Sequence, residues 1–221
     1  MAALPPDYDS DPERWRSMDA SSQVFGDVHE PVAQRLADLG ADPVIDVGGG
    51  QGRLVRALPA GFTGIVVDNS PAQLTDAFGP RVLADARHLP FRDGCAGAVT
   101  ALWMLYHLDE PERAVAESWR LLRPGGWFVT CTSSRRNDPE LTDGYPPTSF
   151  DAEEAEQIVR WVLTDVTVER WDAPMTRLLD REAVLRYCRS HHLPAEAADR
   201  VTPPVWLTKR GCLIYARREG G

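Results

Sequence analysis

The sequence predicts an α/β protein whose core is a doubly wound, mostly parallel β-sheet. Short apolar segments rich in Val and Ile alternate with helical segments from about residue 30 to residue 132. These segments are apolar at consecutive positions, which is typical of strands that helices cover on both faces. A run of glycines directly follows the first of them. Because crossovers between parallel strands are right-handed, repeated units of this kind build an open sheet.

Helices are expected where apolar residues recur at helical spacing. In residues 31–39, Val32, Leu36 and Leu39 lie on one face, and Gly40 ends the segment. Ser70 followed by Pro71 is a typical helix start, because the Ser side chain caps the helix and Pro suits its first position. The helices expected in this region cover residues 31–39, 53–58, 70–78 and 112–122.

The expected strands lie between these helices. They cover residues 43–47, 64–68, 81–85, 97–105 and 127–132. Beyond residue 132 the alternation stops, and a loop rich in Pro, Asp and Gly is expected up to Phe150. A helix over 151–161 is expected next, with Glu153 and Glu154 in its first turn, where the helix dipole favours anions. The remaining expected elements are an alternating strand at 165–171, an amphipathic helix at 180–193 and a final strand at 211–217.

The bulk composition excludes several classes of protein. The chain has 221 residues, enough for one substantial core, and a formal net charge of −9, which disfavours nucleic acid as a partner. No apolar run is long enough to cross a bilayer and no signal peptide is visible, so we expect a cytoplasmic protein without a membrane partner. The four cysteines are scattered without a C-x-x-C pair, which argues against a metal site and against disulfides.

The segment VIDVGGGQG, residues 44–52, carries the functional signal. A phosphate-binding P-loop would need Gly-Lys-Ser or Gly-Lys-Thr, and Gly52 is followed by Arg53. A dinucleotide fingerprint needs G-x-G-x-x-G, and no register of this run fits that spacing. The pattern that fits is D-x-G-x-G-x-G, formed by Asp46, Gly48, Gly50 and Gly52. Read alone, the run also fits a tight turn without a ligand.

Acidic residues at the ends of the next two strands indicate what the glycines hold. Asp68 ends the second strand, where a carboxylate accepts hydrogen bonds from both ribose hydroxyls. Asp85 and Ala86 follow the third strand, within reach of an adenine edge. The predicted ligand is therefore an adenosine that is not attached to a pyrophosphate. Two alternatives stay open: Asp68 caps the following helix, although Ser70 is available for that, and Asp85 is a solvated loop residue.

The segments VIDVGGGQG, IVVDNS, LADARHLPF, ALWMLYHL and RLLRPGGWFV, in this order, resemble the class I S-adenosylmethionine-dependent methyltransferases. The resemblance covers about residues 27–132 and is strongest to the small single-domain branch that acts on small molecules. It implies a Rossmann-like sheet of seven strands, mostly parallel, with the last strand antiparallel. It also implies one domain over 1–221, divided into an N-terminal cap segment (1–26), a cofactor-binding core (27–132) and a lid or substrate insertion with the last strands (133–221).

The same resemblance implies the roles of the cofactor-binding residues. Asp46 and the glycines would line the methionine end of S-adenosylmethionine, Asp68 the ribose, and Asp85 with Ala86 the adenine. The implied set is Asp46, Gly48, Gly50, Gly52, Asp68, Asn69, Asp85, Ala86 and Leu102. The chain departs from the family at Gly49, where many members carry Cys, and at Gln51, where many carry Thr or Ser. Both departures leave the backbone path open.

Methyl transfer needs an aligned nucleophile, and a hydroxyl or ammonium acceptor also benefits from one general base. His107 is the expected base, because it follows the fourth strand at the position where the family faces the transferable methyl; capping a helix or packing against Leu108 is the alternative. Substrate contacts are expected from the N-terminal segment and from the insertion 133–147, which would close over the site. The expected substrate residues are Trp15, Met18, Trp103, Tyr106 and Tyr145, with core packing as the alternative for Trp103 and Tyr106.

Between Asp138 and Glu156 there are seven acidic residues and no basic one. This stretch favours either a cationic substrate or a solvated helix start. The leading hypothesis for function is transfer of a methyl group to O, N or C of a small organic metabolite. An RNA methyltransferase and a cofactor-binding protein that does not methylate are the alternatives. The sequence leaves the acceptor and the oligomeric state undefined.

Overall fold

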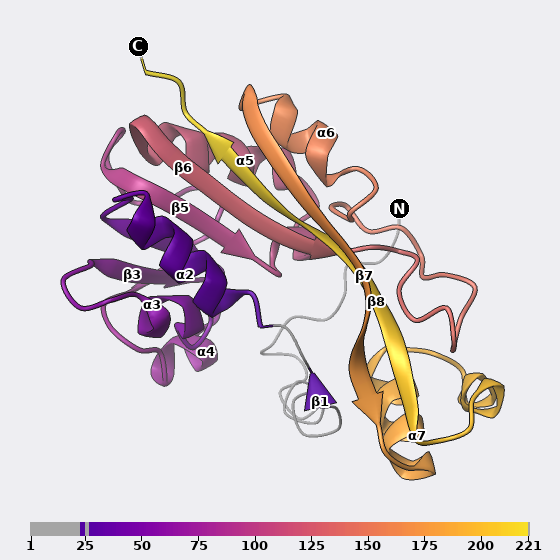
Figure 1. Cartoon of the computed structure of the whole chain (residues 1–221). Coiled ribbons are helices and arrows are strands. Elements are labelled where there is room, and N and C mark those ends of the chain that lie inside the picture. Colours follow the sequence, from indigo (N-terminus) through magenta and orange to yellow (C-terminus); the bar gives the residue numbers. More distant parts are fainter. Residues whose placement is uncertain (1–22, 25–26, 221) are drawn as a thin grey trace.

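The computed structural model of the chain describes residues 23–24 and 27–220. Within this part, eight strands form one sheet in the order β1-β7-β8-β6-β5-β2-β3-β4 (Figure 1). The strands are β1 (Gln23–Val24), β2 (Val44–Val47), β3 (Gly64–Asp68), β4 (Arg81–Leu83), β5 (Ala96–Leu102), β6 (Leu122–Ser133), β7 (Asp165–Leu178) and β8 (Val205–Arg217). The expected N-terminal cap segment, with Trp15 and Met18, lies outside the described residues.

Six α-helices and two short 3₁₀ helices accompany the sheet in the described part. They are α2 (His29–Asp38), α3 (Arg53–Ala57), α4 (Pro71–Thr75), η1 (Leu105–His107), α5 (Pro111–Leu121), α6 (Ala155–Arg160), α7 (Arg181–Ser190) and η2 (Ala195–Arg200). Each α-helix between residues 29 and 121 begins within two residues of an expected start. Local pattern therefore determines this half of the fold. The helix η1 was not expected, and the strand predicted over 97–105 ends at Leu102, before this helix.

The pairing of the strands confirms the predicted fold class. Neighbours from β4 to β6 run parallel, β8 is antiparallel to both β6 and β7, and the short β1 is antiparallel to β7. The last strand is thus reversed, as the resemblance implies. The chain moves outward from β2 through β3 to β4 and then returns to place β5 on the other side of β2. The carboxyl end of β2 is therefore the topological switch point, where such sheets bind ligands.

The sheet is covered on both faces, as the apolar strands predict. All four residues of β2 and all seven of β5 are buried. One core contains residues of α2 and α3, such as Leu36 and Leu54; the opposite core contains residues of α5 and α6, such as Leu121 and Ile158. Because α2 leads through a short connection into β2 and runs opposite to it, the amino end of α2 lies at the carboxyl edge of the sheet.

A smaller core lies beyond that edge. The strands β7 and β8 continue past the end of β6 as a two-stranded ribbon, and α7 packs at its far end (Figure 1). The buried residues of this smaller core are Leu141, Leu178, Ala183, Val184, Tyr187, Cys188, Ala197, Ala198 and Leu207. It forms a cluster separate from the two cores that cover the main sheet.

The structure corrects the expected helix at 151–161. Only Ala155–Arg160 is α-helical, and Glu153 and Glu154 precede the helix instead of forming its first turn. The reason is a set of competing contacts: Asp151 and Glu154 bind the guanidinium of Arg135, and Glu153 accepts a hydrogen bond from Ser134. The last two strands are also longer than expected, and β1 was not predicted.

All four cysteines lie in the described part and are free thiols, with Cys131 and Cys212 buried in the strands as expected. No helix of the described residues has the length and apolar character needed to cross a bilayer.

Candidate cofactor site

The glycine loop after β2 has the backbone that only glycine adopts without strain. Gly48, Gly50 and Gly52 have φ values of 65°, 52° and 76°. A Cβ atom at Gly52 would lie 2.9 Å from the carbonyl oxygen of Phe78, and one at Gly49 would lie 2.4 Å from the Asp46 carboxylate. The amide of Gly48 donates to the carbonyl of Val67 at 2.7 Å, which ties the loop to β3. A side chain is therefore excluded at Gly49 as well as at the three glycines of the motif.

The tight fit at Gly49 bears on the departure from the family pattern. A Cys at this position, as many members carry, would collide with Asp46 in the observed conformation. In the observed conformation the backbone path stays open because Gly49 carries no side chain.

Asp46 is a buried carboxylate beneath this loop. It is 3% exposed, and Thr100 of β5 donates its hydroxyl to it at 2.6 Å. Burial raises the pKa of Asp46 from 3.8 to about 6, against the opposing effects of the Thr100 hydrogen bond and of His29. A charged carboxylate at this buried position lowers the stability of the fold. Titratable groups whose pKa is shifted by burial are characteristic of functional sites.

Asp68 lies at the end of β3 and is engaged by the backbone on both sides. Its two oxygens accept from the amides of Gly50 and Ser70, each at 2.9 Å. Ser70 is the residue that caps α4, through a hydrogen bond from the amide of Gln73. Asp68 therefore does not cap α4, and it holds the glycine loop in place. Because a carboxylate has about four lone-pair positions, these bonds are compatible with added ribose hydroxyls.

The segment predicted to face the adenine is also ordered by its own side chains. Asp85 accepts from the guanidinium of Arg87, with the shortest contact at 2.7 Å, and these bonds hold the pKa of Asp85 below its usual value. Arg87 also pairs with Asp109 at 2.6 Å. Ala86 is buried and Asn69 is exposed. Asp85 is therefore an ion-paired residue whose side chain stays 40% exposed.

The residues after β5 separate to opposite faces of the sheet. Trp103, directly after Leu102, has a φ of 57° and packs against the α2 side, with its ring 5.9 Å from the ring of Trp171. Tyr106 packs against the α5 side, and its ring lies 4.5 Å from that of the half-buried His107. Trp103 and Tyr106 thus do not form one common wall. The left-handed backbone conformation of Trp103 is costly for a residue other than Gly, and such strained residues cluster at functional sites.

Three features of the site were not predicted. Thr100 was missed because a β-branched residue inside a buried strand has the type and position of an ordinary core residue. The side chains of Asp27 and His29 contact each other at the amino end of α2, beside Asp46, although the helix pattern gave no reason to expect this contact. Trp171 lies over Gly211 of the paired strand β8, where a Cβ atom would lie 2.2 Å from its ring. The Trp171 ring reaches the carboxyl edge of the sheet because of the register in which β7 pairs with β8, which the sequence does not indicate.

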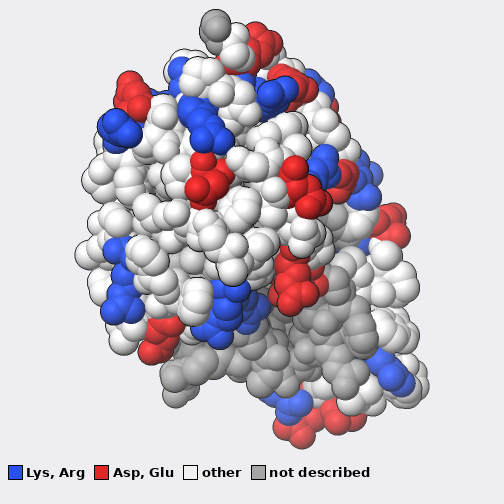
Figure 2. Space-filling view, turned by 60° about the vertical axis from the view of Figure 1, so that its left-hand side comes forward, with Lys and Arg blue, Asp and Glu red and all other residues white. Residues whose placement is uncertain are grey.

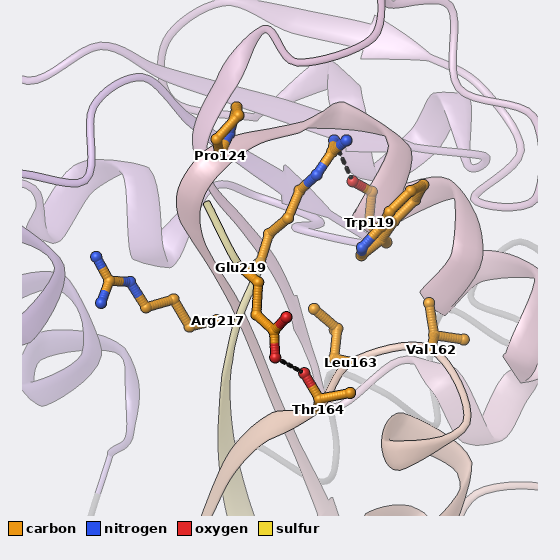
Figure 3. Close-up of a pocket in the computed structure, with 8 residues that line it drawn as sticks. Trp119, Pro124, Val162, Leu163, Thr164, Arg217 and Glu219 are labelled. Carbon is orange, nitrogen blue, oxygen red and sulfur yellow. Dashed lines mark hydrogen bonds between the residues drawn. The ribbon is translucent and has the colours of Figure 1, made fainter. Parts of the chain in front are cut away.

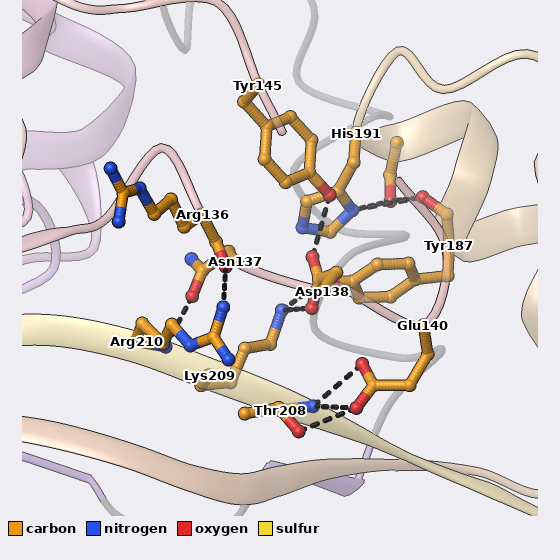
Figure 4. Close-up of polar contacts among 11 residues, drawn as sticks. Arg136, Asn137, Asp138, Glu140, Tyr145, Tyr187, His191, Thr208, Lys209 and Arg210 are labelled. Carbon is orange, nitrogen blue, oxygen red and sulfur yellow. Dashed lines mark hydrogen bonds and ion pairs between the residues drawn. The ribbon is translucent and has the colours of Figure 1, made fainter. Parts of the chain in front are cut away.

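Tyr145 is partly buried in the loop beside the smaller core and donates its hydroxyl to Asp138 at 2.7 Å (Figure 4). The other acids between 138 and 156 are also satisfied within the protein. Lys209 binds Asp138, Thr208 binds Glu140, Arg200 binds Asp143, Arg135 binds Asp151, Glu153 and Glu154, and Arg160 and Arg170 bind Glu156. These pairings support the non-functional interpretation of the acidic stretch, because six of its seven carboxylates already pair with Arg or Lys side chains of the protein.

A hollow of about 350 Å³ lies elsewhere, between Trp119, Val162 and Glu219 (Figure 3). It is formed where β6 and β7 begin and the reversed β8 ends, so it lies at the amino edge of the sheet. Ligands of doubly wound sheets bind at the opposite edge. Among the described residues, no group of three or more His, Cys, Asp or Glu side chains is placed to hold a metal ion.

The described residues fit an adenosyl sulfonium. The loop allows close approach of a ligand to the backbone, and its three glycines lie at the switch point. Two carboxylates, Asp46 and Asp68, lie beneath and beside it and supply negative charge next to a cationic group. The Met104 side chain packs on Gly48, where a built Cβ atom would be 2.6 Å from its Cγ, and this flexible side chain can move aside.

Comparisons with known proteins agree with this geometry. Residues 45–130 match the methyltransferase domain family. The C-methyltransferase UbiE of ubiquinone and menaquinone biosynthesis from Methylobacterium nodulans is 35% identical over 121 residues, which are 48% of this chain and 48% of that protein. The chain thus spans about half the length of the curated relatives that it matches.

Two solved structures share the fold over most of the chain. An S-adenosylmethionine-dependent methyltransferase from Archaeoglobus fulgidus has a TM-score of 0.57 at 17% identity, covering 86% of this chain and 94% of that one. The [4+2]-cyclase SpnF has a TM-score of 0.59 at 18% identity, covering 87% and 81%. Residues 45–130 are thus similar to the methyltransferase domain, and the chain shares the fold of S-adenosylmethionine-dependent methyltransferases.

Proposed function

We propose that this protein transfers a methyl group from S-adenosylmethionine to O, N or C of a small organic metabolite in the cytoplasm. The observation that carries the proposal is the glycine loop at the switch point, with Asp68 at the end of the neighbouring strand and hydrogen-bonded to the loop. When bound, S-adenosylmethionine supplies a methyl group activated by a sulfonium. The residues proposed to hold it are Asp46, Gly48, Gly50, Gly52, Asp68, Asn69, Asp85, Ala86 and Leu102.

Each contact of this set has a physical task. Asp68 accepts hydrogen bonds from the ribose, and its existing bonds to the backbone fix its orientation. Asp46 contributes a buried negative charge near the cationic end of the cofactor, where low polarity strengthens attraction. Asp85 is fixed by Arg87 next to the adenine position. His107 is proposed to take the proton that the acceptor loses. The residues proposed to contact the acceptor are Trp15, Met18, Tyr145 and, from opposite faces of the sheet, Trp103 and Tyr106.

A small molecule fits the surface better than RNA does. Figure 2 shows basic and acidic side chains interspersed on this face, without a continuous basic stripe. The net charge of −9 repels phosphate, which disfavours RNA as a partner. The second candidate function is cofactor binding without methyl transfer. The shared fold does not by itself imply methyl transfer, since one neighbour in fold is named as a [4+2]-cyclase.

The test separates these functions. The protein is incubated with S-adenosylmethionine and a panel of phenols, amines, carboxylic acids, activated methylenes and ribosomal RNA, and formation of S-adenosylhomocysteine is measured. The proposal predicts product with a small acceptor and none with RNA. His107→Gln should lower that rate at least tenfold with unchanged cofactor affinity, whereas His192→Gln, at an exposed position, should not. Tight cofactor binding without product from any acceptor would favour the non-methylating function.

A further inference from the structure

A buried polar network joins three distant segments in the smaller core (Figure 4). Asp138 follows β6, Tyr187 belongs to α7 and Lys209 to β8. One oxygen of Asp138 accepts from the hydroxyls of Tyr145 at 2.7 Å and Tyr187 at 2.8 Å; the other accepts from the Lys209 ammonium at 2.6 Å. The ammonium also contacts the Tyr187 hydroxyl, and the ring of His191 stacks on that of Tyr187 at 3.8 Å.

Backbone contacts extend the network along β8. The amide of Asp138 donates to the carbonyl of Thr208 at 3.0 Å, and the Glu140 carboxylate accepts from the Thr208 hydroxyl at 2.6 Å. The side-chain oxygen of Asn137 accepts from the amide of Arg210 at 2.5 Å. The loop after β6 thus covers the edge of β8 beyond the last residue that β6 pairs. It is held there by polar contacts.

The network fills this core at a cost in folding free energy. Asp138 is fully buried and its φ is 54°, a left-handed conformation that a residue other than Gly adopts at a cost. Burial lowers the pKa of Lys209 although the Asp138 carboxylate acts in the opposite direction. Well-packed apolar residues replace buried ion pairs without loss of stability in many proteins, so stability alone does not account for this pair.

Lys209 is the only lysine among the 24 basic residues of the chain. A compact ammonium with three donors suits a site in which the Asp138 carboxylate and the Tyr187 hydroxyl converge. The broad, planar guanidinium of Arg, used at every other basic position, is a poor substitute there.

We propose that this network is the latch of a cap that unfolds locally as one cooperative unit, separately from the main sheet. The cap consists of the loop 134–147, α7, η2 and the ribbon residues 172–178 and 205–210. Its apolar residues form a core of their own, so opening breaks that core and the latch but leaves the cores around the main sheet intact. The cap lies at the carboxyl edge of the sheet, and its opening widens access to that edge. The proposal does not depend on methyl transfer.

The single lysine makes the opening measurable. Sulfosuccinimidyl acetate is added to the folded chain and to the chain unfolded in urea, and acetylation of Lys209 is followed by mass spectrometry, with the terminal amine as internal reference. The acetylation rate in the unfolded chain divided by the rate in the folded chain measures how strongly folding protects the Lys209 ammonium from the reagent. Hydrogen exchange of the amides in α7 and in β2 reports opening of the cap and of the main sheet in the same sample.

The expected result is agreement between Lys209 and α7. Acetylation of Lys209 should show the same protection as the α7 amides, and that protection should be at least tenfold lower than in β2. Asp138→Asn should lower the protection of both by at least tenfold, with a smaller change in β2. Glu182→Gln, which breaks the exposed pair of Glu182 and Arg186 on α7, is the matched control and should leave Lys209 unchanged. Tyr145→Phe removes one hydrogen bond only and serves if Asp138→Asn does not fold.

Two outcomes overturn the proposal. Protection of Lys209 equal to that of the β2 amides means that the ammonium becomes accessible only by global unfolding. Unchanged protection of Lys209 and α7 in both Asp138→Asn and Tyr145→Phe means that the network is not what keeps the cap closed.

Discussion

Replacement of Asp46 by Asn is predicted to stabilise the fold at neutral and higher pH. The pKa of Asp46 rises from 3.8 to about 6 on folding, because burial penalises its charge. Between these values the folded protein binds a proton more tightly than the unfolded chain, so the free energy of unfolding falls as the pH rises from 3.8 to 6. Each pKa unit corresponds to ~1.4 kcal/mol, which makes the total cost about 3 kcal/mol above pH 6.

Asn removes this charge and keeps an oxygen that can accept from Thr100. Its amide group must be buried in exchange, which costs about 1–2 kcal/mol if it finds no acceptor. Asp46→Asn should therefore raise the free energy of unfolding by about 1–3 kcal/mol at pH 8 and have a smaller or opposite effect at pH 4. The same variant should lose affinity for S-adenosylmethionine, because a group retained at a cost in stability serves function.

The assay is urea denaturation at pH 4 and pH 8, with Asp76→Asn, an exposed acid, as the control. An equal loss of stability at both pH values would refute the reasoning, because it would show that the Asp46 carboxylate is not destabilised by burial. A control that shows the same pH dependence as Asp46→Asn would refute it too.

The remaining predictions concern the glycine loop and the helix that follows β3. Gly52→Ala combines a left-handed backbone with a contact at 2.9 Å to the Phe78 carbonyl and should cost about 2–4 kcal/mol in urea denaturation. Gly40→Ala has a similar φ of 61° and no atom within 4 Å, so it should cost only about 1 kcal/mol; equal losses would show that the loop tolerates a side chain. Ser70→Ala removes the cap of α4 and should cost about 1 kcal/mol, whereas Ser70→Asp should restore most of it.

The first half of the fold could be predicted because local pattern determines it. Val44–Val47 is a buried strand and the glycines after it need left-handed backbone, so both the strand and its sharp turn follow from residue type. Ser70 and Pro71 indicate the start of α4 in the same way. Once β2 and β3 are placed side by side, Asp46 and Asp68 necessarily lie at the same edge.

In the second half, the strands at 165–171 and 211–217 and the helix at 180–193 were predicted, but their extent and contacts were not, because long-range contacts override local preference. The helix after Asp151 starts late, since Arg135, 16 residues earlier in the chain, binds that carboxylate. Asp138 and Lys209 are 71 residues apart, and neither has a neighbour in sequence that indicates the other. The pairing of β7 with β8 extends both strands beyond the alternating segments that predict them.

Calorimetric titration of the protein with S-adenosylmethionine and S-adenosylhomocysteine tests the central claim most directly, which is that the glycine loop and Asp68 bind an adenosyl nucleoside. The account predicts one site of micromolar affinity for each ligand, weakened at least tenfold (about 1.4 kcal/mol) by Asp68→Ala and unaffected by Asp76→Ala. Absence of binding by the unsubstituted protein, or binding that Asp68→Ala leaves unchanged, would contradict it.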